Sequence, residues 1–117
     1  MKRLELSVFV LACCLIGLMA QSVAAQRTGG YAAVSRNNAQ VRAAATFAVA
    51  TQSERGHQPL TLISVRKAGQ QVVAGMNYKV CLQVRDGQRV RTATAVVYRN
   101  LQGQRSFTSW DWGGCDW

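Results

Sequence analysis

The chain has 117 residues, with 14 lysines and arginines against 5 aspartates and glutamates, and a net charge of +9. This length allows one small domain and excludes a multidomain enzyme. The 49% apolar content suits a packed core, and the 16% charged content is too low for a disordered charged tail.

The N-terminus has the features of a secretory leader. Lys2 and Arg3 precede an apolar run at residues 8–20, and the small residues Val23 and Ala25 suit signal peptidase cleavage after Ala25. The run is shorter than the about 20 apolar residues that cross a membrane, so we expect no stable membrane insertion after cleavage. The alternative is a lipoprotein acylated at Cys13, which would leave apolar residues 15–19 in the mature chain.

We therefore predict a signal peptide at residues 1–25 and one secreted domain at residues 26–117, extracellular or periplasmic and monomeric. Cleavage removes two basic residues and one acidic residue, leaving 12 against 4 and a net charge of +8. Of the four cysteines only Cys81 and Cys115 remain. In an oxidising compartment they predict one disulfide, with two free thiols as the alternative.

The mature chain begins with residues 26–37, which lack periodicity and predict an extended, partly mobile segment. Asn38 is a plausible helix N-cap, because its side-chain oxygen accepts from the first turn. A helix is predicted from residue 39 to about residue 52. Apolar residues at three- and four-residue spacing form its buried stripe, with Phe47 at the edge: Val41, Ala44, Ala45, Ala48 and Val49.

Four strands are predicted after the turn-rich residues 54–59. The first runs from residue 60 to 73 with a possible bulge at Ala68-Gly69, and the second alternates from residue 76 to 85. Asp86-Gly87 predicts a hairpin turn, and residues 92–99 and 106–112 predict the last two strands. One helix covering one face of an antiparallel meander makes an α+β domain.

The chain shows no constellation for catalysis or metal binding. His57 is the sole histidine and lies in a polar linker, the acidic residues are scattered singly, and Cys81 has no histidine partner. No phosphate-binding glycine motif is present either. We therefore expect no enzyme activity, no cofactor and no metal site.

The unusual feature is an apolar segment between the first two predicted strands. Its sequence is Gln71-Val72-Val73-Ala74-Gly75, where a solvated turn should be polar. Apolar residues at a hairpin tip indicate a surface that becomes buried in a partner. Followed by Asn77-Tyr78, this segment resembles the first inhibitory hairpin of the cystatins, which are protein inhibitors of papain-like cysteine proteases.

Other landmarks of the resemblance follow in the same order along the chain. Gly29-Gly30 lies where cystatins have their N-terminal glycine, and residues 44–49 resemble the helix signature with its Phe-Ala-Val. The resemblance covers residues 29 to about 103. It implies a long helix lying across a curved antiparallel sheet of four to five strands.

The resemblance also implies an inhibitory mechanism without any covalent reaction. In cystatins an N-terminal segment and two hairpins form a wedge that fills the protease cleft reversibly and competitively. Here the expected contacts are Gly29 or Gly30 in the N-terminal segment and the first-hairpin residues: Gln71, Val72, Val73, Ala74 and Gly75.

Two contacts of the wedge depart from the cystatin pattern. The second hairpin lacks the usual Pro-Trp, and Leu101 is the nearest apolar substitute. Only three residues precede Gly29 after cleavage, without the bulky apolar residue common there. Losing an aromatic anchor costs about 2 kcal/mol or more, so we expect weaker or more selective inhibition. We expect Trp110, Trp112 and Trp117 to pack over the sheet face away from the helix.

The basic charge has two interpretations. Arginines at positions 85, 89, 91, 99 and 105 suit solvated strand faces that discourage edge-to-edge pairing. Alternatively, they hold an anionic partner, which would make the chain a non-inhibitory binding module of the same fold. No nucleic-acid motif accompanies the charge, so no nucleic-acid partner is expected.

Overall fold

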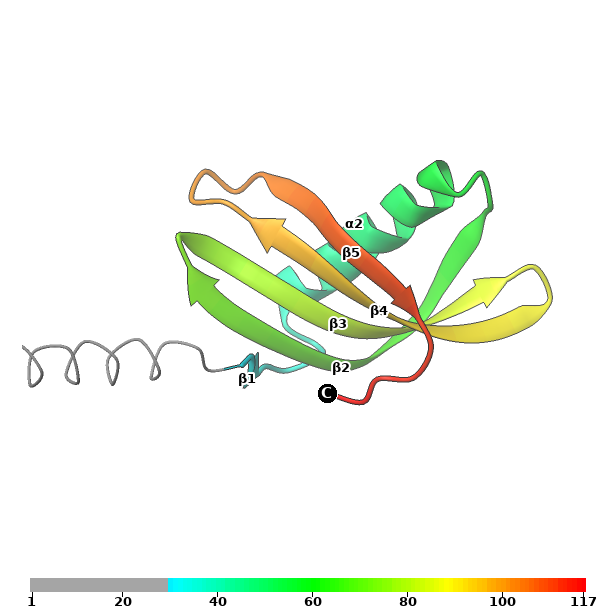
Figure 1. Ribbon diagram of the computed structural model, residues 1–117, viewed down its shortest axis with the longest axis horizontal. Coiled ribbons are helices and arrows are strands. Elements are labelled where there is room, and N and C mark those ends of the chain that lie inside the picture. Colours follow the sequence, from blue (N-terminus) through cyan, green and yellow to red (C-terminus); the bar gives the residue numbers. More distant parts are fainter. Residues whose placement is uncertain (1–29) are drawn as a thin grey trace, which may run out of the picture. The chain divides into compact units, whose positions relative to one another are not determined.

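The computed structural model describes residues 30–117, so the predicted leader at residues 1–25 and Gly29 lie outside the described residues. Residues Tyr31–Trp117 form one compact unit. Its elements, in chain order, are β1 (Ala32–Ala33), α2 (Ala39–Arg55), β2 (Leu60–Val73), β3 (Gly75–Asp86), β4 (Arg89–Arg99) and β5 (Arg105–Trp112). The strands form one antiparallel sheet in the order β1-β2-β3-β4-β5, with α2 across one face (Figure 1). This confirms the predicted α+β architecture.

Helix α2 begins where the sequence predicts and ends about one turn later, at Arg55. The Asn38 side-chain oxygen accepts hydrogen bonds from the backbone N–H groups of Gln40 and Val41, at 2.8 and 3.3 Å. These bonds satisfy two of the donors that a helix leaves free at its N-terminus. All five residues of the predicted stripe are buried.

The core lies between this stripe and the sheet. Alternate residues of β3 and β4 point toward the helix and are buried: Tyr78, Val80, Leu82, Val84, Ala93, Ala95 and Val97. The alanines of α2 let the helix approach the sheet closely, so the valines and leucine of the strands fill the space between them. Among residues 30–117, no helix is long and apolar enough to cross a membrane.

Strand β2 differs from its prediction. Its irregularities lie between Leu62 and Ser64 and between Val65 and Lys67, not at Ala68-Gly69. Gly69 lies in a regular stretch of the ladder, where it permits close packing. A Cβ atom there would lie 2.8 Å from the Cβ of Tyr31 and 3.3 Å from the indole of Trp117.

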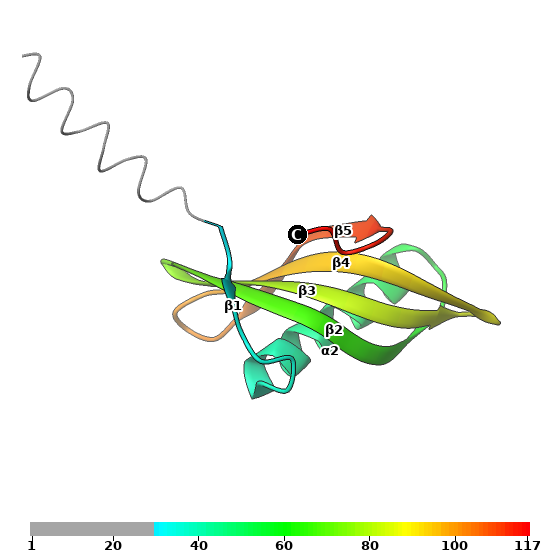
Figure 2. The same ribbon diagram turned by 90° about the horizontal axis from the view of Figure 1, so that it is seen from below.

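The C-terminal tail crosses the sheet face opposite the helix (Figure 2). A disulfide joins Cys81 of β3 to Cys115, with the Cα atoms 5.8 Å apart, as the cysteine count predicts. Beyond it, the indole N–H of Trp117 donates to the Thr94 hydroxyl at 3.2 Å. The tail therefore covers part of the face that α2 leaves open.

The expected position of two tryptophans is wrong. Trp110 and Trp112 pack in a T-shaped pair against the core on the helix side, with ring centroids 5.2 Å apart. They lie opposite Ala95 and Ala93, which pair on β3 with the core residues Val80 and Leu82. Only Trp117 packs over the other face, because the disulfide brings it there.

Candidate functional site

Two hairpins meet at one end of the sheet. The first joins β2 to β3, the second joins β4 to β5 through residues 100–104, and both tips lie at the left end of Figure 1. The β3–β4 hairpin lies at the opposite end. The antiparallel order of the strands therefore brings residues 71–75 close to residues 100–104.

The turn of the first hairpin is very short. Val73 of β2 pairs with Gly75 of β3, so Ala74 alone forms the tip. Gly75 has a φ of 111°, a conformation that favours glycine. A Cβ atom at Gly75 would also lie 2.9 Å from the Tyr98 hydroxyl oxygen and 3.1 Å from the Asn100 Cα. The first hairpin is thus a rigid continuation of the sheet.

This rigid tip presents apolar side chains to solvent. Val72 is 78% exposed and Val73 is 43% exposed. The Asn77 amide donates to the Gln71 side-chain oxygen at 3.1 Å, which links the two strands just behind the tip. Exposed valines on an ordered hairpin bind an apolar surface at a small entropic cost.

The turn of the second hairpin is stabilised by hydrogen bonds to one asparagine side chain. The Asn100 side-chain oxygen accepts from the backbone N–H groups of Gln102 and Gln104, at 3.0 and 2.9 Å. Leu101 at the tip is 77% exposed. This hairpin therefore offers one aliphatic side chain to a partner.

A tyrosine that sequence reasoning missed connects the two hairpins. The Tyr98 hydroxyl, from β4, donates a hydrogen bond to the Ala74 carbonyl at the tip of the first hairpin. Tyr98 lies opposite Asn77 in the β3–β4 register. The alternation of β4 indicates the face of Tyr98, but no local signal indicates that its hydroxyl reaches Ala74.

The first strand of the domain lies beside β2. Ala32 pairs with Gln70 and Ala33 pairs with Gly69 in antiparallel register, so of this pair Ala32 lies nearer the first hairpin. Gly30 is exposed, with nothing within 4 Å of a Cβ built on it. Burial raises the pKa of Tyr31 above its ordinary value of 10.0, so its ring is neutral at physiological pH.

The chemistry of this end is that of a binding surface. Residues 71–75 and 100–104 carry amide, aliphatic and glycine groups and contain no nucleophile or acid–base pair. Across residues 30–117, no group of three or more metal-binding side chains occurs. The arrangement is suited to shape-complementary docking.

Comparison with known proteins decides the family. Residues 34–112 match the model of the SQAPI family, described as aspartic acid proteinase inhibitor. The chain belongs to this cystatin-like family of proteinase inhibitors. The match includes α2, the four long strands and both hairpins. Together with the cystatins described next, this match confirms the resemblance to cystatins stated from the sequence.

Similar proteins include inhibitors from ticks and a plant. Cystatin-2 of Ornithodoros moubata is 29% identical over 90% of this chain and 98% of its own length. Cysteine proteinase inhibitor 1 of Actinidia chinensis var. chinensis is 35% identical over 60% of this chain and 61% of its own. The crystal structure of a salivary cystatin from the soft tick O. moubata matches with a TM-score of 0.64 at 28% identity, covering 74% of this chain and 98% of the tick chain.

Proposed function

We propose that this cystatin-like inhibitor blocks papain-like cysteine proteases reversibly and competitively, by inserting the two hairpins and the N-terminal segment into the active-site cleft. The observation that carries the proposal is the pair of exposed valines, Val72 and Val73, on the rigid first hairpin. The O. moubata and Actinidia chinensis relatives, named as cystatin and cysteine proteinase inhibitor, support the protease class.

The proposed contacts divide unequally among the parts of the wedge. Gln71, Val72, Val73, Ala74 and Gly75 form the main contact. Burying one valine side chain contributes about 1.5 to 3 kcal/mol, and Gly75 lets the backbone come close to the enzyme. Leu101 adds a smaller contact, and Gly29 or Gly30 adds a backbone contact. No bond of the inhibitor is offered for cleavage, so the complex is reversible.

We also propose that the protein is exported, with residues 1–25 as its leader. The Cys81–Cys115 disulfide supports this proposal, because disulfides persist in oxidising compartments. The target would then be a protease that the inhibitor meets in the extracellular space or the periplasm.

Inhibition of aspartic proteases is a second candidate, favoured by the description of the matching family. The two candidates differ in the groups that the wedge must cover, a thiolate in one enzyme class and a pair of carboxylates in the other. The relatives named as cystatin and as cysteine proteinase inhibitor favour the cysteine protease class.

The test is a titration of residues 26–117 against papain and against pepsin over a series of substrate concentrations. We expect competitive inhibition of papain with a constant below about 1 µM, and no inhibition of pepsin. Papain with a methylthio group on its catalytic cysteine should still bind, because the mechanism forms no covalent bond. Inhibition of pepsin alone would favour the second candidate, and inhibition of neither enzyme would contradict both.

A further inference from the structure

A pocket of about 570 Å³ lies where the two ends of the domain meet over β2. We call it the terminal pocket and define it by Tyr31, Ala33, Arg36, Arg66, Lys67 and Trp117, which line it. Its position differs from that of the hairpin tips, which contribute no lining residue. Its volume falls in the range of small-molecule sites, about 300 to 1,000 Å³.

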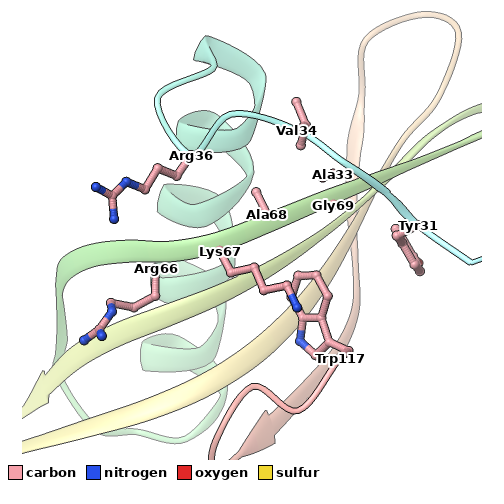
Figure 3. A pocket seen from close by; sticks show the side chains of 9 residues that line it. All are labelled: Tyr31, Ala33, Val34, Arg36, Arg66, Lys67, Ala68, Gly69 and Trp117. Carbon is pink, nitrogen blue, oxygen red and sulfur yellow. The ribbon is translucent and has the colours of Figure 1, made fainter.

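Three cations line the terminal pocket. Figure 3 shows the Arg36 and Arg66 side chains reaching toward the same side, while Lys67 points toward the indole of Trp117. No acidic residue belongs to the lining. Within residues 30–117 the one ion pair joins Arg91 to Asp86, far along the sheet from this pocket. The side chains that line the pocket therefore carry positive charge only.

The other side of the terminal pocket is aromatic and rigid. The Lys67 ammonium lies 4.5 Å from the centroid of the Trp117 ring, and the Lys79 ammonium lies 4.8 Å from it. The Trp117 indole N–H is held by Thr94, and the Cys81–Cys115 bond fixes the backbone two residues before it. The aromatic wall is thus pre-organised, which reduces the entropic cost of binding.

The floor between the two sides is small and apolar. The Val34 backbone N–H donates to the Ala68 carbonyl at 3.2 Å, which closes the N-terminal segment onto β2. Ala33, Ala68 and Gly69 line the space that remains. A Cβ atom on Gly69 would lie 2.8 Å from the Tyr31 Cβ and 3.3 Å from the Trp117 indole, so these two side chains pack closely over this part of the floor.

We propose that the terminal pocket binds an organic oxyanion, a sulfate or phosphate ester carried on an aromatic or apolar body. The Arg36 and Arg66 guanidinium groups would take the oxyanion, because their planar donor forks match sulfate and phosphate oxygens. The body would lie over Ala33 and Ala68 against the Trp117 indole. This binding function is separate from protease inhibition, since it uses none of the hairpin residues.

The test uses phenyl sulfate and phenyl phosphate as probes, with phenyl β-glucoside as a neutral probe and inorganic sulfate as a probe without a body. Binding is followed through the Trp117 indole N–H signal in two-dimensional NMR spectra at about 0.15 M salt. We expect saturable shifts with one or both phenyl esters and at least about tenfold weaker binding of the glucoside and of inorganic sulfate. The order of the two esters distinguishes a sulfated from a phosphorylated ligand.

Charge-matched variants make the test specific. The double variant Arg36→Gln/Arg66→Gln should weaken ester binding about tenfold or more. The control variant Arg85→Gln/Arg89→Gln removes the same charge from exposed arginines at the distant β3–β4 hairpin and should leave binding unchanged. Equal losses in the two variants, absence of saturable shifts, or equally tight binding of inorganic sulfate would overturn the proposal. Each result leaves the proposed protease inhibition untouched.

Discussion

A single hydroxyl group links the two hairpins at the binding end of the sheet. Tyr98 donates to the Ala74 carbonyl, and a Cβ atom at Gly75 would lie 2.9 Å from that hydroxyl oxygen. The exposed valines are therefore held by a contact that itself lies outside the apolar tip. A substitution at Tyr98 should therefore change the affinity for the protease although the tip residues themselves are unchanged.

Replacing Tyr98 by phenylalanine tests this contact. Tyr98→Phe removes the hydrogen bond to Ala74, which contributes about 0.5 to 1.5 kcal/mol. We expect papain inhibition to weaken by about threefold to tenfold, and the melting temperature to fall by about 4 to 8 °C for each kcal/mol of stability that is lost. The paired measurement is the inhibition constant and the thermal midpoint of the same preparation. An unchanged inhibition constant would show that the Tyr98 hydroxyl does not position the tip.

The second hairpin should contribute modestly. Leu101→Ala removes the one large apolar side chain of this hairpin but leaves the Asn100 hydrogen bonds in place. We expect the inhibition constant to rise by about fivefold to thirtyfold, because the lost side chain corresponds to about 1 to 2 kcal/mol of burial. An increase in the inhibition constant of about a thousandfold would show that this hairpin, and not the first one, makes the main contact.

At the scale of elements, the Asn38 cap fixes where α2 begins. Asn38→Ala leaves two backbone N–H groups of the first turn without their partner and costs about 1 kcal/mol. We expect the melting temperature to fall by about 4 to 8 °C, with an unchanged inhibition constant. Asn38→Asp is the matched control, since its carboxylate also caps the helix. A similar fall in both variants would exclude a capping role.

The elements show which patterns the sequence predicts well. The three- and four-residue spacing of valines and alanines predicted the buried face of α2, and the strict alternation of β3 predicted its two faces. The bulges of β2 could not be predicted, because Ser64 and Lys67 have no bulge signature. Gly69 gave a false signal, since close packing against Tyr31 and Trp117, and not backbone conformation, requires glycine there.

The face of the sheet on which Trp110 and Trp112 lie depends on strand pairing that the local sequence does not reveal. A register shift beside Val96 and Val97 lets Phe107 and Trp110, three residues apart, face the same side. Strict alternation along β5 would have placed them on opposite faces. The apolar hairpin tip was predictable from its composition, whereas the contact of Tyr98 with Ala74 depends on the pairing of distant strands.

At the scale of the whole molecule, the disulfide attaches the C-terminal tail to the central strand. It closes a loop with a sequence separation of 34 residues, which corresponds to about 3 to 4 kcal/mol in the chain-entropy account. We expect Cys115→Ser to lower the melting temperature by more than about 10 °C. Inhibition measured well below that midpoint should change by less than about threefold, because the hairpin tips lie elsewhere. An unchanged midpoint would show that the bond contributes little to stability.

The central claim is that the valines of the first hairpin enter the protease cleft, and the most direct test compares the Val73→Asp and Val90→Asp variants. Both replace an exposed valine with aspartate, at 43% and 51% exposure, but Val90 lies at the opposite end of the sheet. Burying an unpaired carboxylate is costly, so Val73→Asp should raise the papain inhibition constant at least about 100-fold. Val90→Asp should inhibit as the wild type does. Equal inhibition constants for the two variants would contradict the account.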